Sequence, residues 1–212
     1  MSAVELSERD LCAALRRGDE SAFSTVVSLY QAPLRRLALS YVRSAAVADE
    51  VVQETWLGVI RGIHAFEERS SLKTWIFRIL TNTAKTRAER ESRVVPVSAL
   101  PAVGLDGDEP AVDPDRFFDQ QRARWPGHWA SPPARWDELP AEHLEGHELL
   151  DAMKGAIEEL PSRQRQVIVL RDIEGWDAEE VCRVLELSEA NQRVLLHRAR
   201  SKVRQALEDQ LG

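Results

Sequence analysis

The feature that most constrains the fold of this chain is the uneven distribution of proline along its 212 residues. Eight of the ten prolines fall between residues 94 and 146, together with several Gly and Asp residues. Proline lacks the backbone donor that a helix needs and clashes with the preceding turn, so a segment this rich in proline interrupts any helical unit. We predict that residues 94–146 form a linker between two domains, at 8–93 and 147–212.

Both flanking parts show helical periodicity and no sustained two-residue alternation of the kind that strands require. Apolar side chains recur at helical spacings from Glu8 onward, with an interruption at Gly18 and Asp19. Further helices are expected from about Ala45 to His64 and after Ser70 or Ser71, either of which can cap a helix. The predicted fold class is therefore all-α, with two small helical domains joined by a long proline-rich linker.

One strip of the helix expected over residues 45–64 is polar. Glu50, Gln53, Glu54 and Leu57 follow one another at spacings of three and four, which places them on the same side of a helix. Most such strips are only solvated surface. The alternative is a docking face for a basic partner.

The helix expected after Ser71 is basic. From Leu72 to Arg93 six cations stand against Glu89 and Glu91, and aromatic and amide groups are interleaved with them. Proteins that bind single strands combine cations with stacking groups and base-edge partners in this way. A solvated face of an ordinary surface helix explains the same charges, so both interpretations stay open at this point.

The C-terminal part ends in a pattern typical of a helix-turn-helix. A helix is expected from about Asp177 to Leu185, and Ser188 can cap a second helix after the turn. Five cations and no acid lie between residues 190 and 204, as in a recognition helix that enters the major groove. A surface hairpin with a solvated basic face is the alternative. Glu186 stands where many such turns use glycine, and a left-handed residue there costs roughly 1 kcal/mol.

The net charge of -7 does not exclude nucleic-acid binding. Residues 94–146 carry four basic and ten acidic side chains and hold most of the acid excess, and DNA binding depends on local charge. The sequence has no apolar run of about 18 residues and no secretory signal, so we expect a cytoplasmic protein without a membrane span.

The residues that could hold a metal form a weak pattern. His143 and His147 stand four apart with Asp151 nearby, but there is no HExxH motif, so surface residues are the favoured interpretation. Cys12 and Cys182 are too few and too far apart for a metal knuckle or a disulfide framework, and we expect both in or near the core. No metal, no other cofactor and no catalytic residue is predicted.

Four motifs occur in a specific order: DEVVQETW, LKTWIFRILTNTAKTR, LPSRQRQVIVLRDIEGWDAEEV and LHRAR. In this combination the chain resembles a bacterial RNA polymerase sigma factor of the extracytoplasmic-function (ECF) subfamily. About Asp19 to Arg93 resembles sigma region 2, and about Glu148 to Leu207 resembles sigma region 4. The resemblance implies a transcription initiation factor that works with core RNA polymerase and is not an enzyme.

The resemblance also implies roles for residues of the first domain. Glu50, Gln53 and Glu54 would dock on the clamp helices of the largest polymerase subunit. The segment from Phe66 to Asn82 would capture a flipped base of the melted -10 promoter element, with Asn82 at a base edge. The full set expected at the -10 element is Phe66, Arg78, Asn82, Lys85 and Arg87, whereas Trp75 is assigned to the core.

In the second domain the resemblance places the recognition helix in the major groove of the duplex -35 element. Leu195 departs from the pattern, because many members have a basic residue there. The residues expected at this element are Ser188, Asn191, Gln192, Arg193, His197, Arg198, Arg200 and Lys202.

The resemblance implies core RNA polymerase, promoter DNA and an anti-sigma factor as partners. Trp125, Trp129 and Trp136 of the linker match no family motif. The alternatives are a stand-alone helix-turn-helix regulator that binds an operator without polymerase, and a metal hydrolase built on His143, His147 and Asp151.

Overall fold

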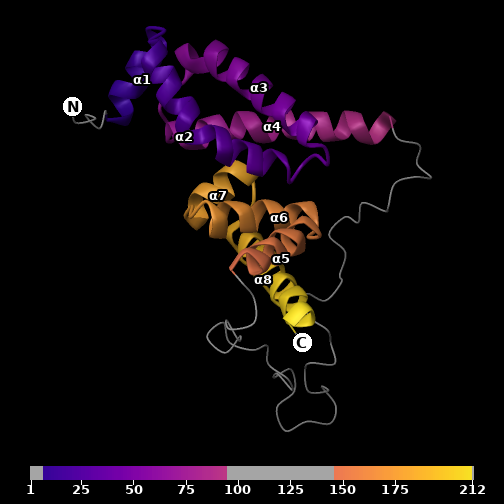
Figure 1. Ribbon diagram of the computed structural model, residues 1–212. Helices are drawn as coiled ribbons and strands as arrows, with labels where there is room; N and C mark the ends of the chain where they lie inside the picture. Colours follow the sequence, from indigo (N-terminus) through magenta and orange to yellow (C-terminus); the bar gives the residue numbers. More distant parts are fainter. Residues whose placement is uncertain (1–6, 95–145, 212) are drawn as a thin grey trace. The chain divides into compact units, whose positions relative to one another are not determined.

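The computed structural model describes residues 7–94 and 146–211 (Figure 1). Within these ranges every regular element is a helix, so the predicted all-α class is confirmed. Nearly all of the predicted linker lies outside the described residues, and so do His143 and the three tryptophans Trp125, Trp129 and Trp136.

The described residues form a succession of helices, and their bounds agree with the periodicity of the sequence. The first four are α1 (Glu8–Arg16), α2 (Glu20–Ala38), α3 (Ala45–Gly62) with a short 3-10 turn η1 (Ile63–Ala65), and α4 (Leu72–Val94). The C-terminal helices are α5 (Gly146–Glu158), α6 (Ser162–Ile168), the π-helical turn η4 (Val169–Ile173), α7 (Ala178–Leu185) and α8 (Glu189–Leu211).

Short polar side chains begin several of these helices by accepting hydrogen bonds from backbone N–H groups that have no partner within the helix. Asp19 accepts from Ser21 and Ala22 at 2.9 and 3.1 Å, and the preceding Gly18 has a φ of +74°. The predicted interruption at this point is confirmed. Of the two serines considered for α4, Ser71 is the cap, because its Oγ accepts from the Thr74 N–H at 3.1 Å.

The chain divides into two compact units. Among the described residues, one unit lies within Met1–Val103 and Val169–Glu189, and the other within Gly104–Ile168 and Ala190–Gly212. The first unit thus combines α1–α4 with η4 and α7. The domain limits 8–93 and 147–212 stay a prediction.

The core of the first unit forms where α2, α3 and α4 pack against one another, as Figure 1 shows. Leu34 and Leu37 of α2, Val52 of α3, and Ile76 and Leu80 of α4 have no exposed surface. Burial of such side chains is the main favourable contribution to folding. It also fixes which sides of α3 and α4 remain available to partners.

Glycine allows α3 and α4 to approach closely at one position. A Cβ atom at Gly58 would lie 2.9 Å from Cγ2 of Ile79 on α4. That is shorter than carbon atoms tolerate, and Cγ2 branches next to the backbone, so the two helices would have to shift. In contrast, a Cβ atom at Gly155 of α5 would meet nothing within 4 Å.

We therefore expect opposite effects from two glycine-to-alanine substitutions. Gly58→Ala should lower the free energy of unfolding by about 1–3 kcal/mol, because overpacking outweighs the better helix propensity of alanine. Gly155→Ala should raise it by about 0.5–1 kcal/mol. Urea unfolding followed by circular dichroism measures both. A stabilising Gly58→Ala would contradict the close packing of α3 on α4.

Candidate polymerase and nucleic-acid interfaces

The strip predicted on α3 is exposed along its length. Glu50, Gln53, Glu54 and Leu57 all lie at the surface, and Leu57 is 49 % exposed. The opposite side of the helix is buried in the first unit. The strip is therefore the free face of a helix that is anchored on its other side.

The strip continues to Ile60, which lies outside the predicted set. Ile60 is 52 % exposed and stands three residues after Leu57, so the same helical spacing could have found it. Two exposed apolar side chains beside acidic and amide groups form an apolar centre with a polar edge. Protein interfaces are commonly built in this way.

Glu50 and Arg87 pair with each other, although they are predicted to contact different partners. Arg87 Nη2 of α4 donates to Glu50 Oε2 of α3. Their side chains are 31 % and 54 % exposed, so solvent screens the pair and it contributes at most about 1 kcal/mol. Either residue can exchange this partner for another at small cost.

The residues predicted at the -10 element occupy different environments on α4. Asn82 and Arg78 are exposed. Lys85 is more enclosed, because its Nζ lies 2.8 Å from Oε2 of Glu186, and Arg78 Nη2 lies 3.9 Å from Oε1 of the same carboxylate. The exposed side of α4 thus presents the Asn82 amide one turn from the Arg78 cation, and Lys85 lies beside it against the Glu186 carboxylate.

Phe66 does not lie on this exposed side. Its side chain is 6 % exposed and stacks on Trp75, with the ring centroids 4.8 Å apart, and its carbonyl oxygen accepts from Arg16 Nη2 at 2.6 Å. Trp75, assigned to the core, is only partly buried. The apolar ring of Phe66 packs inside the unit, so it has no surface with which to stack on a base.

The residues predicted at the -35 element differ in exposure according to their position around α8. Asn191, Arg193, His197 and Arg200 of α8 are exposed, as is Ser188 just before it, whereas Arg198 and Lys202 are partly buried. Gln192 is 1 % exposed and belongs to a buried stripe. The other members of this stripe are Leu196, Ala199, Val203 and Leu207. Counting back four residues from Leu196 would have placed Gln192 in the stripe from sequence alone.

The turn between α7 and α8 has the strained residue that the sequence suggests. Glu186 lies in the left-handed region with φ 57° and ψ 49°, although it carries a side chain. The N–H of the following Leu187 donates to the Cys182 carbonyl at 3.0 Å, which closes the end of α7. The tight turn of three residues, Glu186–Ser188, therefore requires a locally strained backbone.

Cys12 is buried in the first unit. Burial raises the pKa of the Cys12 thiol above its usual range, and the nearby Glu68 and Glu8 carboxylates add to this. Cys182 is partly buried. Residues 7–94 and 146–211 contain no group of three metal-ligating side chains and no helix long and apolar enough to cross a membrane.

Comparison with known families explains this arrangement. The family model described as Sigma-70 region 2 matches residues 26–94, and the model described as Sigma-70, region 4 matches residues 150–203. Between them the two models span more than half of the chain. The chain belongs to the ECF sigma factors of bacterial RNA polymerase. It is therefore a transcription initiation factor that directs RNA polymerase to promoters.

Individual relatives match this sigma factor over almost its whole length. It is 28 % identical to the RNA polymerase sigma-H factor of Pseudomonas aeruginosa over 201 aligned residues. The alignment covers 95 % of this chain and 94 % of the relative. It is 27 % identical over 199 residues to the ECF RNA polymerase sigma-E factor of Escherichia coli, with 94 % and 93 % covered.

Two solved structures share the fold. One is CnrH in complex with the cytosolic domain of CnrY, with a TM-score of 0.59 and 20 % identity over 96 % of this chain and 99 % of that one. The other is the sigma factor RpoE in complex with the anti-sigma factor NepR from Bartonella quintana. Its TM-score is 0.57, with 22 % identity over 88 % of this chain and 96 % of that one.

The strain at Glu186 can be measured by comparing two substitutions. Glu186→Gly and Glu186→Ala both remove the carboxylate near Lys85, but only glycine adopts positive φ without a steric cost. We expect the glycine variant to be more stable than the alanine variant by about 1 kcal/mol in urea unfolding. Equal stabilities would show that residue 186 is not left-handed in solution.

Proposed function

We propose that this sigma factor uses three separate surfaces to direct polymerase. The α3 strip of Gln53, Glu54, Leu57 and Ile60, with Glu50 at its edge, docks on core RNA polymerase. The observation that carries this assignment is the exposure of all these side chains on one face of a helix whose other face is buried. Two apolar side chains supply contact area, and the acidic and amide groups select a basic partner.

The exposed side of α4 would hold the melted -10 element. Unstacking a base costs a few kcal/mol, and a site that binds the extruded base offsets part of that cost. Asn82 offers an amide to a base edge, while Arg78, Lys85 and Arg87 neutralise phosphates. Because Phe66 is buried, we leave it out of this contact set. The surface favours the open strand by binding it better than the duplex.

The exposed side of α8 would bind the duplex -35 element. Asn191 and Arg193 lie near the N-terminus of the helix, where side chains reach base edges in the major groove. His197, Arg198, Arg200 and Lys202 follow along the helix as phosphate contacts, and Ser188 precedes it. Gln192 supports α8 from the buried side instead of touching a base, because its side chain is 1 % exposed.

We propose that residues 8–93 and 147–212 act as separate domains tethered by 94–146, that the protein works in the cytoplasm with polymerase, and that it has no catalytic role. RpoE of Bartonella quintana is described in complex with an anti-sigma factor. We propose that this chain is likewise held inactive by an anti-sigma factor.

Reconstitution tests the function directly. Sequencing of transcripts after overproduction should reveal two shared upstream motifs at a fixed separation. Run-off transcription from such a promoter should then require both core polymerase and this protein. A stand-alone regulator would instead shift an operator fragment in a gel without polymerase, and that result would overturn the proposal.

The docking surface is tested by the double variant Gln53→Ala/Glu54→Ala. Loss of two interface side chains should weaken binding to core polymerase at least tenfold, which corresponds to about 1.4 kcal/mol or more. Fluorescence anisotropy of labelled protein titrated with core enzyme measures it. Glu20→Ala, an exposed acid on α2, is the control and should bind like the parent protein. Unchanged binding of the double variant would remove the α3 assignment.

The role of Asn82 is tested by separating promoter binding from promoter opening. Asn82→Ala should reduce the fraction of open complexes about tenfold, since one base-edge contact contributes roughly 1–3 kcal/mol, and should leave closed complexes intact. Permanganate reactivity of unpaired thymines measures opening, and a gel shift in the cold measures closed binding. Thr86→Ala, one turn further along α4, is the control. Equal losses in both assays would rule out a role for Asn82 in opening.

A further inference from the structure

Helix α8 has a large apolar side chain on its exposed side. Val194 is 47 % exposed, whereas the next two residues, Leu195 and Leu196, are 3 % and 8 % exposed. Among the residues of α8 whose burial the structure describes, Val194 is the only large apolar side chain at the surface. A single exposed valine is common on protein surfaces, so its meaning depends on where it stands on the helix.

Val194 stands opposite the buried stripe of α8. The stripe includes Gln192, Leu196 and Val203, and successive residues of a helix are turned by about 100° around its axis. Val194 is therefore turned by about 200° from Gln192 and from Leu196, and by about 180° from Val203. Because the stripe is the buried side of the helix, Val194 lies at the centre of its outward side.

Polar residues of the proposed -35 surface surround Val194. Asn191 precedes it by three residues, and His197 and Arg198 follow it by three and four, so these side chains are its neighbours on the helix surface. Ala190, one turn before Val194, is exposed, and its small side chain leaves room for a close approach to the valine. Val194 is therefore the apolar centre of a surface whose edge is polar.

In the major groove, such an apolar centre distinguishes one base from the other three. Thymine alone presents a methyl group there, on C5, whereas the edges of the other bases offer hydrogen-bond donors and acceptors without a methyl group. The valine methyl groups can pack on the thymine methyl group. They offer no hydrogen bond to the polar edge of another base, which would lose its water without gaining a partner.

We propose that Val194 selects a thymine in the duplex -35 element by packing against its C5 methyl group. This inference rests on the proposed function of α8 and deepens it, because it names a base that the helix recognises. Arg198 and Lys202 are proposed to contact phosphates, and phosphate contacts position a protein on DNA without reading its sequence. The valine supplies selectivity that those cations lack.

Removal of the methyl group from the DNA tests the contact. A promoter fragment identified by transcript sequencing is prepared with each thymine of its upstream motif, on either strand, replaced in turn by deoxyuridine. Deoxyuridine lacks the C5 methyl group and keeps the same base-pairing edge. With the parent protein and core polymerase, one replacement should weaken closed-complex binding about three- to fivefold, as expected for loss of one buried methyl group. Competition gel shifts in the cold measure this binding.

Substitution of Val194 shows whether the valine is the group that recognises the methyl group. Val194→Ala removes both Cγ methyl groups at an exposed position of a helix, where alanine is well tolerated. This variant should bind the thymine and deoxyuridine fragments equally. Val194→Thr keeps one of the two methyl groups and should keep part of the preference for thymine.

Arg198→Ala is the matched control. Arg198 lies one turn from Val194 on α8 and is proposed to contact a phosphate. Its loss should weaken binding to the thymine and deoxyuridine fragments by the same factor. The preference of the parent protein for thymine should therefore remain in this variant.

The failure of this inference differs from the failure of the proposed function. If the polymerase with this protein binds the promoter but no deoxyuridine replacement weakens binding, or if Val194→Ala keeps the full preference, Val194 does not select thymine and the proposed function stands. An upstream motif without thymine would lead to the same conclusion. If the parent protein does not bring core polymerase to the promoter, the proposed function is overturned, and the thymine contact with it.

Discussion

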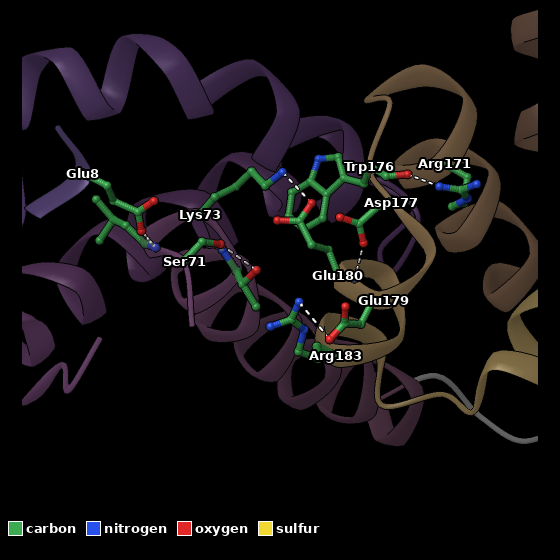
Figure 2. A network of polar contacts seen from close by, with 11 residues as sticks. Glu8, Ser71, Lys73, Arg171, Trp176, Asp177, Glu179, Glu180 and Arg183 are labelled. Carbon is green, nitrogen blue, oxygen red and sulfur yellow. Dashed lines mark hydrogen bonds and ion pairs between the residues drawn. The ribbon is translucent and has the colours of Figure 1, made fainter. Parts of the chain in front are cut away.

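The structure of the first unit depends on the burial of α4 on two adjacent sides. Leu72, Ile76, Leu80 and Ala84 are buried in the core. The next side of α4, with Lys73, Phe77, Thr81 and Lys85, contacts the segment that contains η4 and α7, as Figure 2 shows for Lys73. A helix with 3.6 residues per turn has room for only one further side. Arg78 and Asn82 lie there. The exposure of Arg78 and Asn82 is therefore a consequence of how the other two sides of α4 are buried.

Burial of one side also determines which face of α3 is exposed. Its apolar side packs on α2 and α4, and the absence of a side chain at Gly58 lets α3 approach Ile79 closely. The outward strip is the part of α3 that we propose to bind polymerase. It carries apolar side chains, Leu57 and Ile60, in water, which is an unfavourable exposure unless a partner covers them.

Much of this could be predicted because helical spacing is a local property. The exposed strip on α3, the Ser71 cap and the left-handed Glu186 all follow from side chains a few residues apart, and the structure has each of them. The burial of Phe66 and Gln192 was harder to predict from the sequence. A motif position implies a role, but burial depends on what packs against the residue. For Gln192 the buried stripe of α8 was a usable signal, whereas nothing local to Phe66 indicates its stack on Trp75.

The sequence by itself determined the all-α class, the helix limits, the order of the motifs and the family, because periodicity, capping and motif order depend on neighbours along the chain. Only the tertiary structure decided that Lys73 and Lys85 lie against Glu180 and Glu186, about a hundred residues further along the sequence. A charge on a helix surface has no preferred partner until packing brings one within reach. The pairing of α4 with α7 therefore depends on the burial of Phe77 and Trp176, which no local pattern encodes.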